Sequence, residues 1–522
     1  MNTGQATRPL LGGRRLQQQR RQGCRASAPA WNARAARALA TMACAFGLSA
    51  CSTAPPVATA LNDPALIPQR FAGAGPTVSA PAPAATGSAP TAAGATLSWN
   101  QFFTDPRLQA LIRLALEHNR DLRVAALNVE QARAQATIRE ADLWPTVNAG
   151  VSGNRVATNT GGVSTTVTGG LATTAYELDL LGRVRQQAAA AQAQLRASEF
   201  LQSAARASLI AAVAAAYVNL QADEALLSIT QDTVRSREES RQLVIGRLKA
   251  GAASTLDLAQ ADALLQSARA ALAQVQRQKA LDESTLLLLI GRPLPADLPM
   301  GSGQGLQALL QEPARAPGSG DARALNGLAV LQAGLPSEVL VQRPDIGAAE
   351  AQLRAAQANV EAARRAYFPR ISLTASYGQA SKELSALFAG GTWVWGVAPQ
   401  LLAPIFDAGR LRAGVQQAQA AQQAALAQYE KAVQVAFKET SDALASQSLL
   451  AEQLQALRLQ QQAESQRVAL SQARWRLGAS AYTEVLDAQR SLYAAQTAVV
   501  QAAALALINQ ASLYKALGGG AL

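Results

Sequence analysis

Residues 247–261 read RLKAGAASTLDLAQA, and residues 474–488 read RWRLGASAYTEVLDA. The two stretches align without a gap, which pairs Arg247 with Arg474, Gly251 with Gly478, Asp257 with Glu484 and Ala261 with Ala488. In each copy basic residues precede a glycine, which is typical of a helix that ends in a left-handed residue and carries cations at its C-terminal end. In the first copy, Ser254 and Asp257 also have the spacing of a capping box for a following helix. The chain therefore repeats one helix-turn-helix, and this repeat decides the fold.

The similarity extends over two halves of the chain. DLRVAALNVEQARAQATIREADLWP at 121–145 matches DIGAAEAQLRAAQANVEAARRAYFP at 345–369, and DLLGRVR at 179–185 matches FDAGRLR at 406–412. Each half predicts a very long helix, about 180–249 and about 408–476, each roughly 100 Å long at 1.5 Å per residue. The shorter helices, expected at about 117–143, 254–290, 348–366 and 481–516, nearly match the long ones when placed end to end. We therefore expect a column of paired antiparallel helices.

Between the helices, short stretches alternate as β-strands do. ISLTASYG from Ile371 places apolar residues on one face and Ser or Thr on the other. TWVWGVAPQL from Thr392 alternates in the same way, with Trp393, Trp395 and Val397 on one face. The stretches around Val147 and Val167 alternate less cleanly. Four strands of about nine residues each suit an outer-membrane barrel span. The four strands of one chain cannot close a barrel. The eight strands of two chains would form a barrel whose interior is filled by side chains, so the twelve strands of three chains are the first number expected to leave a pore.

The N-terminal segment has the parts of an export signal. Residues 1–51 hold eight arginines and no acidic residue, and the last of these arginines, Arg37, is followed by the apolar run ALATMACAFGLSA. The run closes on Leu-Ser-Ala-Cys, which resembles a bacterial lipobox, and we expect Cys51 to be acylated with an N-acyl diglyceride and palmitate. An ordinary signal with a chance cysteine is the alternative. We predict a signal peptide at 1–50 and an acylated N-terminus with an Ala/Pro/Thr/Ser-rich tether at 51–96.

Composition excludes several classes of function. Without that segment, 39 basic residues face 35 acidic ones, so the sequence pI of about 10.1 gives no reason to expect a nucleic-acid partner. Cleavage before Cys51 leaves one cysteine, and no uninterrupted apolar run reaches the ~18 residues of a spanning helix. The single histidine, His118, and one methionine after the signal leave no soft-metal relay, and no catalytic or phosphate-binding motif occurs. We therefore expect that the chain is not an enzyme, and that it has no metal site and no cofactor other than the covalent lipid.

In order and duplication, these motifs resemble the TolC-like outer membrane efflux channels, in particular the lipoprotein branch that serves resistance-nodulation-division pumps. The resemblance covers residues from about 99 to 517 and includes FTDPRLQALIRLALEHNRDLR from Phe103 and Arg-Pro-Asp-Ile from Arg343. It implies a mainly α-helical fold with a membrane β-barrel. In that family three chains form a twelve-stranded barrel on a twelve-helix periplasmic α-barrel.

The resemblance also implies partners and a place in the cell. The chain would be a homotrimer in the outer membrane of a Gram-negative bacterium, lipid-anchored, with a long periplasmic extension. Drugs or other small molecules from an inner-membrane resistance-nodulation-division transporter would reach it through a periplasmic adaptor, a membrane fusion protein. Type I protein secretion and metal efflux are alternatives on the same fold. A coiled-coil scaffold without a pore is a more distant one.

Site residues follow from the same resemblance. The adaptor would dock on the tips of the two hairpins, at Arg247, Lys249, Gly251, Ser254, Arg474, Arg476, Gly478 and Ser480. Side chains near the tips would close the mouth, with Asp257, Tyr482, Glu484 and Asp487 as gate candidates; solvated helix faces are the alternative. An interfacial aromatic belt would contain Tyr377, Trp393, Trp395 and Phe406, with packing at the strand–helix junctions as the alternative.

The expected domain division follows the repeat. The first efflux repeat is placed at 97–300, with strands at about 146–179 and a tip at about 247–255. An inter-repeat equatorial segment at 301–342 separates it from the second repeat at 343–517, with strands at about 370–406 and a tip at about 474–482. Residues 518–522 form a C-terminal tail.

Overall fold

The computed structural model describes residues 98–157, 161–295, 306, 310, 342–387 and 393–520. The helices are α2 (Trp99–Phe102), α3 (Pro106–His118), α4 (Arg120–Ala141), α5 (Arg183–Lys249), α6 (Thr255–Ile290), α8 (Pro344–Arg365), α9 (Arg410–Arg476) and α10 (Tyr482–Ala516). The strands are β1 (Asn148–Ala157), β2 (Val163–Leu178), β3 (Arg370–Ser381) and β4 (Trp393–Leu402), and a short 3₁₀ turn, η3, covers Leu384–Ala386. Cys51, the signal, the tether and nearly all of the segment 301–342 lie outside the described residues.

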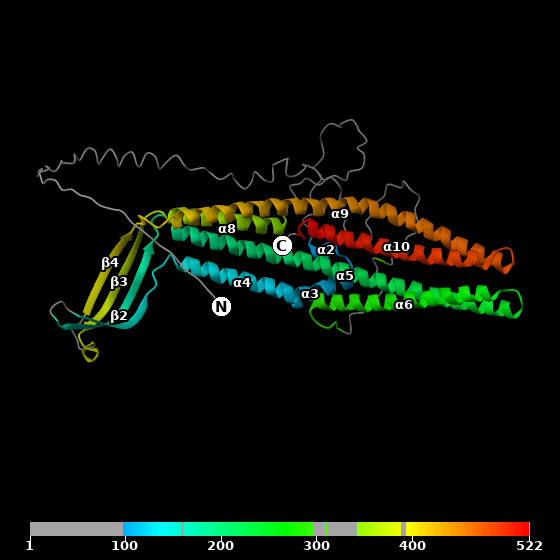
Figure 1. Cartoon of the computed structure of the whole chain (residues 1–522), viewed down its shortest axis with the longest axis horizontal. Helices are drawn as coiled ribbons and strands as arrows, with labels where there is room; N and C mark the ends of the chain where they lie inside the picture. The colour runs from blue at the N-terminus through cyan, green and yellow to red at the C-terminus, as the bar shows by residue number, and fades with distance from the viewer. Residues whose placement is uncertain are drawn as a thin grey trace, which may run out of the picture. The chain divides into compact units, whose positions relative to one another are not determined.

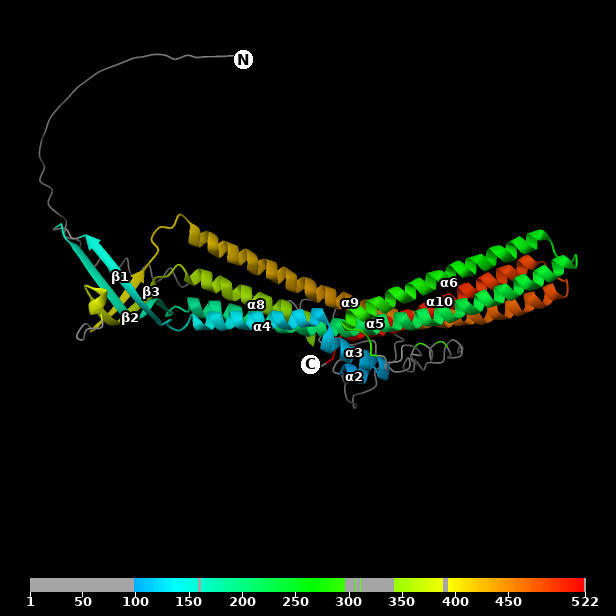
Figure 2. The same cartoon turned by 90° about the horizontal axis from the view of Figure 1, so that it is seen from below.

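The helices pack lengthwise as two hairpins with shorter helices stacked on them. α5 packs against α6 and α9 against α10, while α8 lies between α5 and α9, and α10 packs against α5 (Figure 1). α5 and α9 each have 67 residues, which corresponds to about 100 Å at 1.5 Å per residue. Figure 2 shows the tips of both hairpins at the same end of the bundle, away from the sheet. The long helices predicted from the repeat are therefore present.

The four strands form one antiparallel sheet in the order β1-β2-β3-β4. Tyr377 pairs with Leu171 on one side and with Trp395 on the other, which fixes the register of the three strands. A bulge interrupts β2 between Thr173 and Tyr176, where Ala175 adopts a φ of 51°. Within the described sheet, β1 and β4 are edge strands with one paired neighbour each.

The first short helix differs from its predicted extent. One helix was expected at about 117–143, but the chain breaks at Asn119, which ends α3 and caps α4 by accepting a hydrogen bond from the amide of Leu122 at 2.8 Å. The Asn119 amide group also donates to the carbonyl of Leu289 at 2.8 Å. At this level α6 ends at Ile290, and the next residue, Gly291, has a φ of +78° and a backbone so close to His118 that a side chain would not fit. The break thus accommodates the end of α6.

Most of the interior is formed by small aliphatic side chains. One cluster at the middle of the bundle joins α3, α5, α8, α9 and α10 around Phe102, Tyr217 and Tyr429. By composition, α5 and α10 each contain an 18-residue window apolar enough to cross a membrane, although only 50% and 44% of those windows are buried. Both helices pack against other helices of the chain, and their alanine content explains the high mean hydropathy.

Candidate functional site: the hairpin tips and the membrane sheet

The two tips are built as the same turn. At the end of α5, the amide of Ala252 donates to the carbonyl of Arg247 at 2.8 Å and the amide of Gly251 to that of Leu248 at 3.0 Å. At the end of α9, Ala479 and Gly478 repeat these bonds at 2.9 and 3.0 Å, to Arg474 and Trp475. Both glycines are left-handed, with φ of +71° and +75°. These are Schellman motifs, as the basic-then-glycine pattern predicts.

The helices that follow the tips begin differently. Ser254 accepts a hydrogen bond from the amide of Asp257 at 3.1 Å, and the Asp257 carboxylate accepts from the amide of Ser254 at 2.9 Å. α10 has Ala481 at the corresponding N-cap, without a side-chain bond. The first tip is therefore held by a capping box that the second tip lacks.

Arg247 connects the two hairpins. Its guanidinium donates to the carbonyls of Trp475 at 3.1 Å and Arg476 at 2.9 Å, and it lies 4.1 Å from the centre of the Trp475 ring. It thus caps the C-terminal end of α9 with a positive charge, in addition to a cation–π contact. Arg247 thus contacts the other hairpin and is half-buried, and the docking role predicted for it stays a prediction.

Tyr482 is also directed inward. The tyrosine is buried, at 4% exposure, in a cluster with Val244, Leu264 and Trp475, and its ring centre lies 5.0 Å from that of Trp475. Burial, together with the charge of Asp257 on the other hairpin, raises the pKa of the Tyr482 hydroxyl to about 12. Within the protomer the neighbouring hairpin covers the Tyr482 side chain, and its role at the gate stays a prediction.

The carboxylates proposed for the gate are bound within their own hairpins. Asp257 caps α6, Glu484 lies 3.1 Å from the guanidinium of Arg474, and Asp487 lies 3.2 Å from that of Arg490. The structure thus brings Arg474 and Glu484 together at the second tip. The remaining docking candidates are found at the turns. Lys249, Gly251, Ser254, Arg476 and Gly478 are exposed, and Ser480 is half-buried.

Trp475 is the tip residue that the sequence prediction missed. It contacts both Arg247 and Tyr482, so it lies at the centre of the contact between the hairpins. In the repeat alignment it stands where the first copy has Leu248. That replacement of an aliphatic residue by a large aromatic one was the available signal. We call Arg247, Trp475 and Tyr482 the tip bridge.

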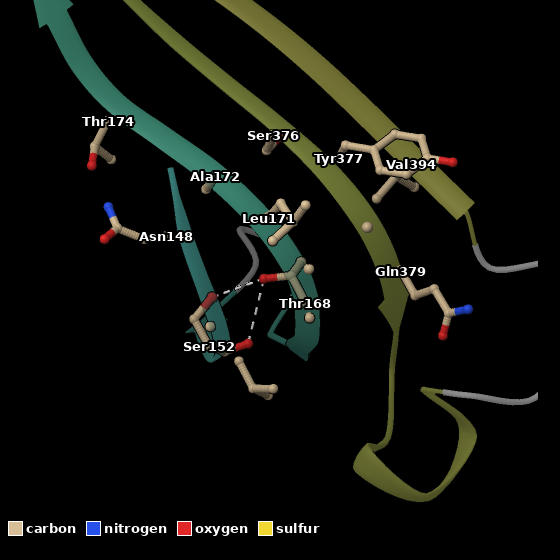
Figure 3. Close-up of a pocket in the computed structure, with 15 residues that line it drawn as sticks. Asn148, Ser152, Thr168, Leu171, Ala172, Thr174, Ser376, Tyr377, Gln379 and Val394 are labelled. Atoms are coloured by element: carbon tan, nitrogen blue, oxygen red, sulfur yellow. Dashed lines mark hydrogen bonds between the residues drawn. The ribbon is translucent and has the colours of Figure 1, made fainter. Parts of the chain in front are cut away.

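The sheet has two chemically different faces. By register, Val151, Leu171, Tyr377, Trp395, Val397 and Leu401 share one face, and Ser152, Thr168, Ser372, Thr374, Ser376 and Gln400 share the other. The apolar face is exposed, with Leu171 at 51% and Trp395 at 76%. On the polar face, the hydroxyls of Ser152 and Thr168 hydrogen-bond across β1 and β2 at 2.8 Å (Figure 3). A hollow of about 340 Å³ lies over these strands and is lined in part by Gly150, Gly169, Gly170 and Gly378.

Three of the four belt candidates form one aromatic group. Tyr377, Trp393 and Trp395 lie on the apolar face of β3 and β4, with the rings of Tyr377 and Trp393 5.2 Å apart. All three are exposed, so packing inside the protomer does not explain them. Phe406 lies apart, beyond the end of β4 at Leu402, next to the start of α9. It is 90% exposed and belongs to the strand–helix junction.

Searching the described residues for three or more His, Cys, Asp or Glu side chains able to hold a metal finds none. His118 lies beside Arg292, with 3.0 Å between its Nε2 and the guanidinium.

Comparison with known proteins agrees with this architecture. The outer membrane efflux protein family matches residues 111–292 and 335–519. The toluene efflux pump outer membrane protein TtgC of Pseudomonas putida is 41% identical over 447 residues, which cover 84% of this chain and 88% of TtgC. The outer membrane protein OprJ of Pseudomonas aeruginosa is 40% identical, over 81% of this chain and 86% of OprJ.

A solved structure shows the same fold. The open state of the MtrE outer membrane channel of Neisseria gonorrhoeae matches with a TM-score of 0.72 and 39% identity, over 83% of this chain and 94% of MtrE. The mainly helical fold with a membrane β-sheet, predicted from the repeat, is thereby confirmed. The chain belongs to the outer membrane efflux protein family and is an outer-membrane channel component of an efflux pump, with a transport role and not an enzymatic one.

Proposed function

We propose that three copies of the chain form one exit duct, in which β1 of each protomer pairs with β4 of the next. The observation that carries this proposal is the two-faced sheet with two open edges. Edge strands in a membrane must be paired, because lipid offers no hydrogen bonds to their amides and carbonyls. With four strands per chain, three chains make twelve strands, enough for a lumen lined by Ser and Thr and an outer surface of Leu, Val and Trp.

The helices would continue this duct into the periplasm. Their length of about 100 Å carries the hairpin tips well away from the membrane. The exposed turn residues Lys249, Gly251, Ser254, Arg476 and Gly478 would receive a periplasmic adaptor, through which an inner-membrane resistance-nodulation-division transporter supplies cargo. The duct itself is passive. The similarity to a toluene efflux protein supports small organic molecules, including drugs, as the cargo.

A lipid anchor is the remaining part of the proposal. The lipobox-like sequence ending at Cys51 supports acylation, and the Ala/Pro/Thr/Ser-rich tether after it supports attachment to the inner face of the outer membrane. Replacing Cys51 by Ala should remove the acyl mass from the purified chain. A wild-type chain whose measured mass shows no acyl groups would contradict the anchor without affecting the duct.

Site-specific photo-crosslinking tests the docking surface. A photoreactive side chain in place of Ser254 or Arg476 should capture the adaptor in cells, whereas the same group in place of Glu130, exposed on α4 far from the tips, should not. The trimer is measured separately, from the native mass of the purified protein. Equal capture from Ser254 and Glu130 would contradict docking at the tips, and a native mass other than three chains would contradict the trimer.

A further inference from the structure

A pocket lies between the two hairpins, a few helical turns from their tips. It has a volume of about 230 Å³, and its walls come from α5 of the first hairpin and from α9 and α10 of the second. α5 and α10 lie side by side in the half of the bundle that carries the tips (Figure 2). The polar part of the wall includes Arg237, which lies about 18 Å before the end of α5 at Lys249. The apolar part of the wall is formed by Ile229, Val468, Leu492 and Tyr493.

Arg237 is a buried cation without a counter-ion. The residue is 5% exposed, and no carboxylate of the described residues pairs with it. Burial lowers the pKa of its guanidinium and the charge of Arg490 lowers it further, while Tyr493 acts in the opposite direction. A buried charge that no opposite charge compensates is destabilising. An anion bound in the pocket would therefore be favoured by a charge that the protein itself leaves unpaired.

The guanidinium of Arg237 uses one of its three nitrogens within the protein. Nη1 donates to the carbonyl of Leu264 at 2.9 Å, and the group lies 5.6 Å from the centre of the Tyr493 ring. Nε is enclosed and has no acceptor, and Nη2, which is not enclosed, has none among the described residues. A ligand in the pocket would thus reach Nη2 first.

Nε and Nη2 form the side of a guanidinium that holds carboxylates elsewhere in this chain. Arg183 binds Glu177 through these two nitrogens at 2.9 and 2.6 Å, and Arg343 binds Asp345 through them at 3.0 and 2.7 Å. Such paired hydrogen bonds match the two oxygens of a carboxylate. The corresponding side of Arg237 has no such partner.

The second hairpin also contributes an unpaired polar atom to the pocket. Gln489 on α10 is 8% exposed, and its amide nitrogen donates to the hydroxyl of Ser240 at 3.3 Å. Its amide oxygen has no hydrogen-bond partner in the part of the chain that the structure describes. The packing of the two hairpins therefore does not satisfy the polar groups that line this pocket.

The aromatic wall of the pocket is held in one position. The Thr230 hydroxyl donates to the carbonyl of Leu226 at 2.7 Å, so it accepts at 3.1 Å from the hydroxyl of Tyr493. This bond joins α10 to α5 next to the guanidinium of Arg237. The ring is thus fixed before any ligand binds.

The pocket is specific to one half of the repeat. α5 and α9 align residue by residue over their full length. The alignment places Glu464 opposite Arg237, and the helices that follow place Asp262 opposite Gln489. Packing of a long helix in this fold therefore does not require an arginine at this position.

We infer that this pocket binds one small organic carboxylate per chain, with the carboxylate at Arg237 and an apolar body against Ile229, Val468 and Leu492. A cavity of about 150 Å³ holds a benzene molecule in another protein, so this pocket has room for an aromatic acid. Because all of these residues belong to one chain, the inference requires neither the trimer nor the adaptor.

The charges around the pocket favour a monoanion. Arg237 supplies one unpaired positive charge, whereas Asp232, which also lines the pocket, pairs with Arg235 at 3.1 Å. The carboxylate of Asp232 disfavours a second negative charge on the ligand, as in a phosphate dianion.

Isothermal titration calorimetry of the purified full-length channel with sodium benzoate tests this binding. We expect one site per chain, and binding at least about tenfold weaker for Arg237→Gln, the effect of removing a hydrogen bond from a charged donor. Arg269→Gln is the matched control, because Arg269 lies at the same level of the bundle but pairs with Glu238 at 2.7 Å and does not line the pocket. It should bind benzoate as the wild type does.

A second variant and two other ligands separate the pocket from non-specific binding. Val468→Phe keeps Arg237 but fills part of the pocket, so it should also weaken benzoate binding. Benzyl alcohol, which has the ring without the charge, should bind more weakly than benzoate. Formate, which has the charge without the ring, should not displace benzoate at equal concentration.

The wild-type titrations decide the inference even where a variant does not fold. Absence of benzoate binding to the wild type, displacement by formate, or equally tight binding of benzyl alcohol would overturn it. Unchanged binding by folded Arg237→Gln or folded Val468→Phe would also overturn it. None of these results bears on the proposed duct, which is tested by the native mass and by conductance.

Discussion

Replacing Arg247 by Met should loosen the contact between the two hairpin tips. The substitution keeps most of the side-chain volume but removes two charged hydrogen bonds, to the carbonyls of Trp475 and Arg476, and the cation–π contact with the Trp475 ring. Hydrogen bonds from charged donors contribute roughly 1.5–3 kcal/mol each when buried, and the half-exposed position reduces this. With about 1 kcal/mol for the cation–π contact, we estimate a coupling of about 2 kcal/mol.

That coupling predicts a measurable change in gating. If the closed mouth requires both hairpins to be held together, losing about 2 kcal/mol should raise the ratio of open to closed channels by about 30-fold. Single-channel recording in planar bilayers measures this ratio directly. Combining Arg247→Met with Trp475→Leu should change the ratio by less than the two single effects together, because both substitutions remove the cation–π contact.

Lys249→Met is the matched control for the tip bridge. It removes a basic residue two positions further along the chain that is exposed and has no ion pair among the described residues. The control should leave the open probability unchanged. An equal open probability for Arg247→Met and Lys249→Met would refute the reasoning that the tip bridge holds the mouth closed.

Three further predictions concern docking, stability and pH. Changing Gly251 and Gly478 together to Trp should abolish drug efflux while the trimer still assembles. Both glycines have open space around them, and a side chain at their positive φ costs only about 1–2 kcal/mol each. Normal drug resistance in this variant would contradict docking of the adaptor at the tips. Arg343→Met should lower the free energy of unfolding by about 3 kcal/mol, measured by thermal unfolding, because this buried side chain joins the carboxylates of Asp345 and Glu439 at 2.7 and 2.6 Å. Burial, with a hydrogen bond to Asp282, raises the pKa of Asp223 from 3.8 to about 7. The contribution of this carboxyl to the free energy of unfolding is therefore complete below about pH 4 and is lost as pH rises through 7. Asp223→Asn should flatten this dependence of stability on pH, and an unaltered dependence would exclude the carboxyl as its cause.

The long helices could be predicted from the sequence because their ends carry local signals. Gly251 and Gly478 end two of them, and Ser254 with Asp257 starts another, so the predicted bounds lie within a few residues of those observed. The strands could be predicted because one face of the sheet is polar and the other apolar. The break at Asn119 was missed because its cause is the end of α6, about 170 residues further along the chain.

The side-chain environment of the tips could not be predicted in the same way. Tyr482 is a large residue at a turn, and its local sequence does not reveal that the other hairpin covers it. Arg247 was expected to be exposed because its partners, the carbonyls at the end of α9, are 228 and 229 residues away. The acylation of Cys51 remains a prediction from the sequence.

Planar-bilayer recording of the purified wild-type protein tests the central claim most directly. Trimers that resist dissociation on a gel and form ion-conducting pores are expected, because twelve strands with a polar inner face enclose water. Absence of any channel at any applied voltage, together with absence of a heat-resistant trimer, would contradict the account of the chain as one third of an outer-membrane duct.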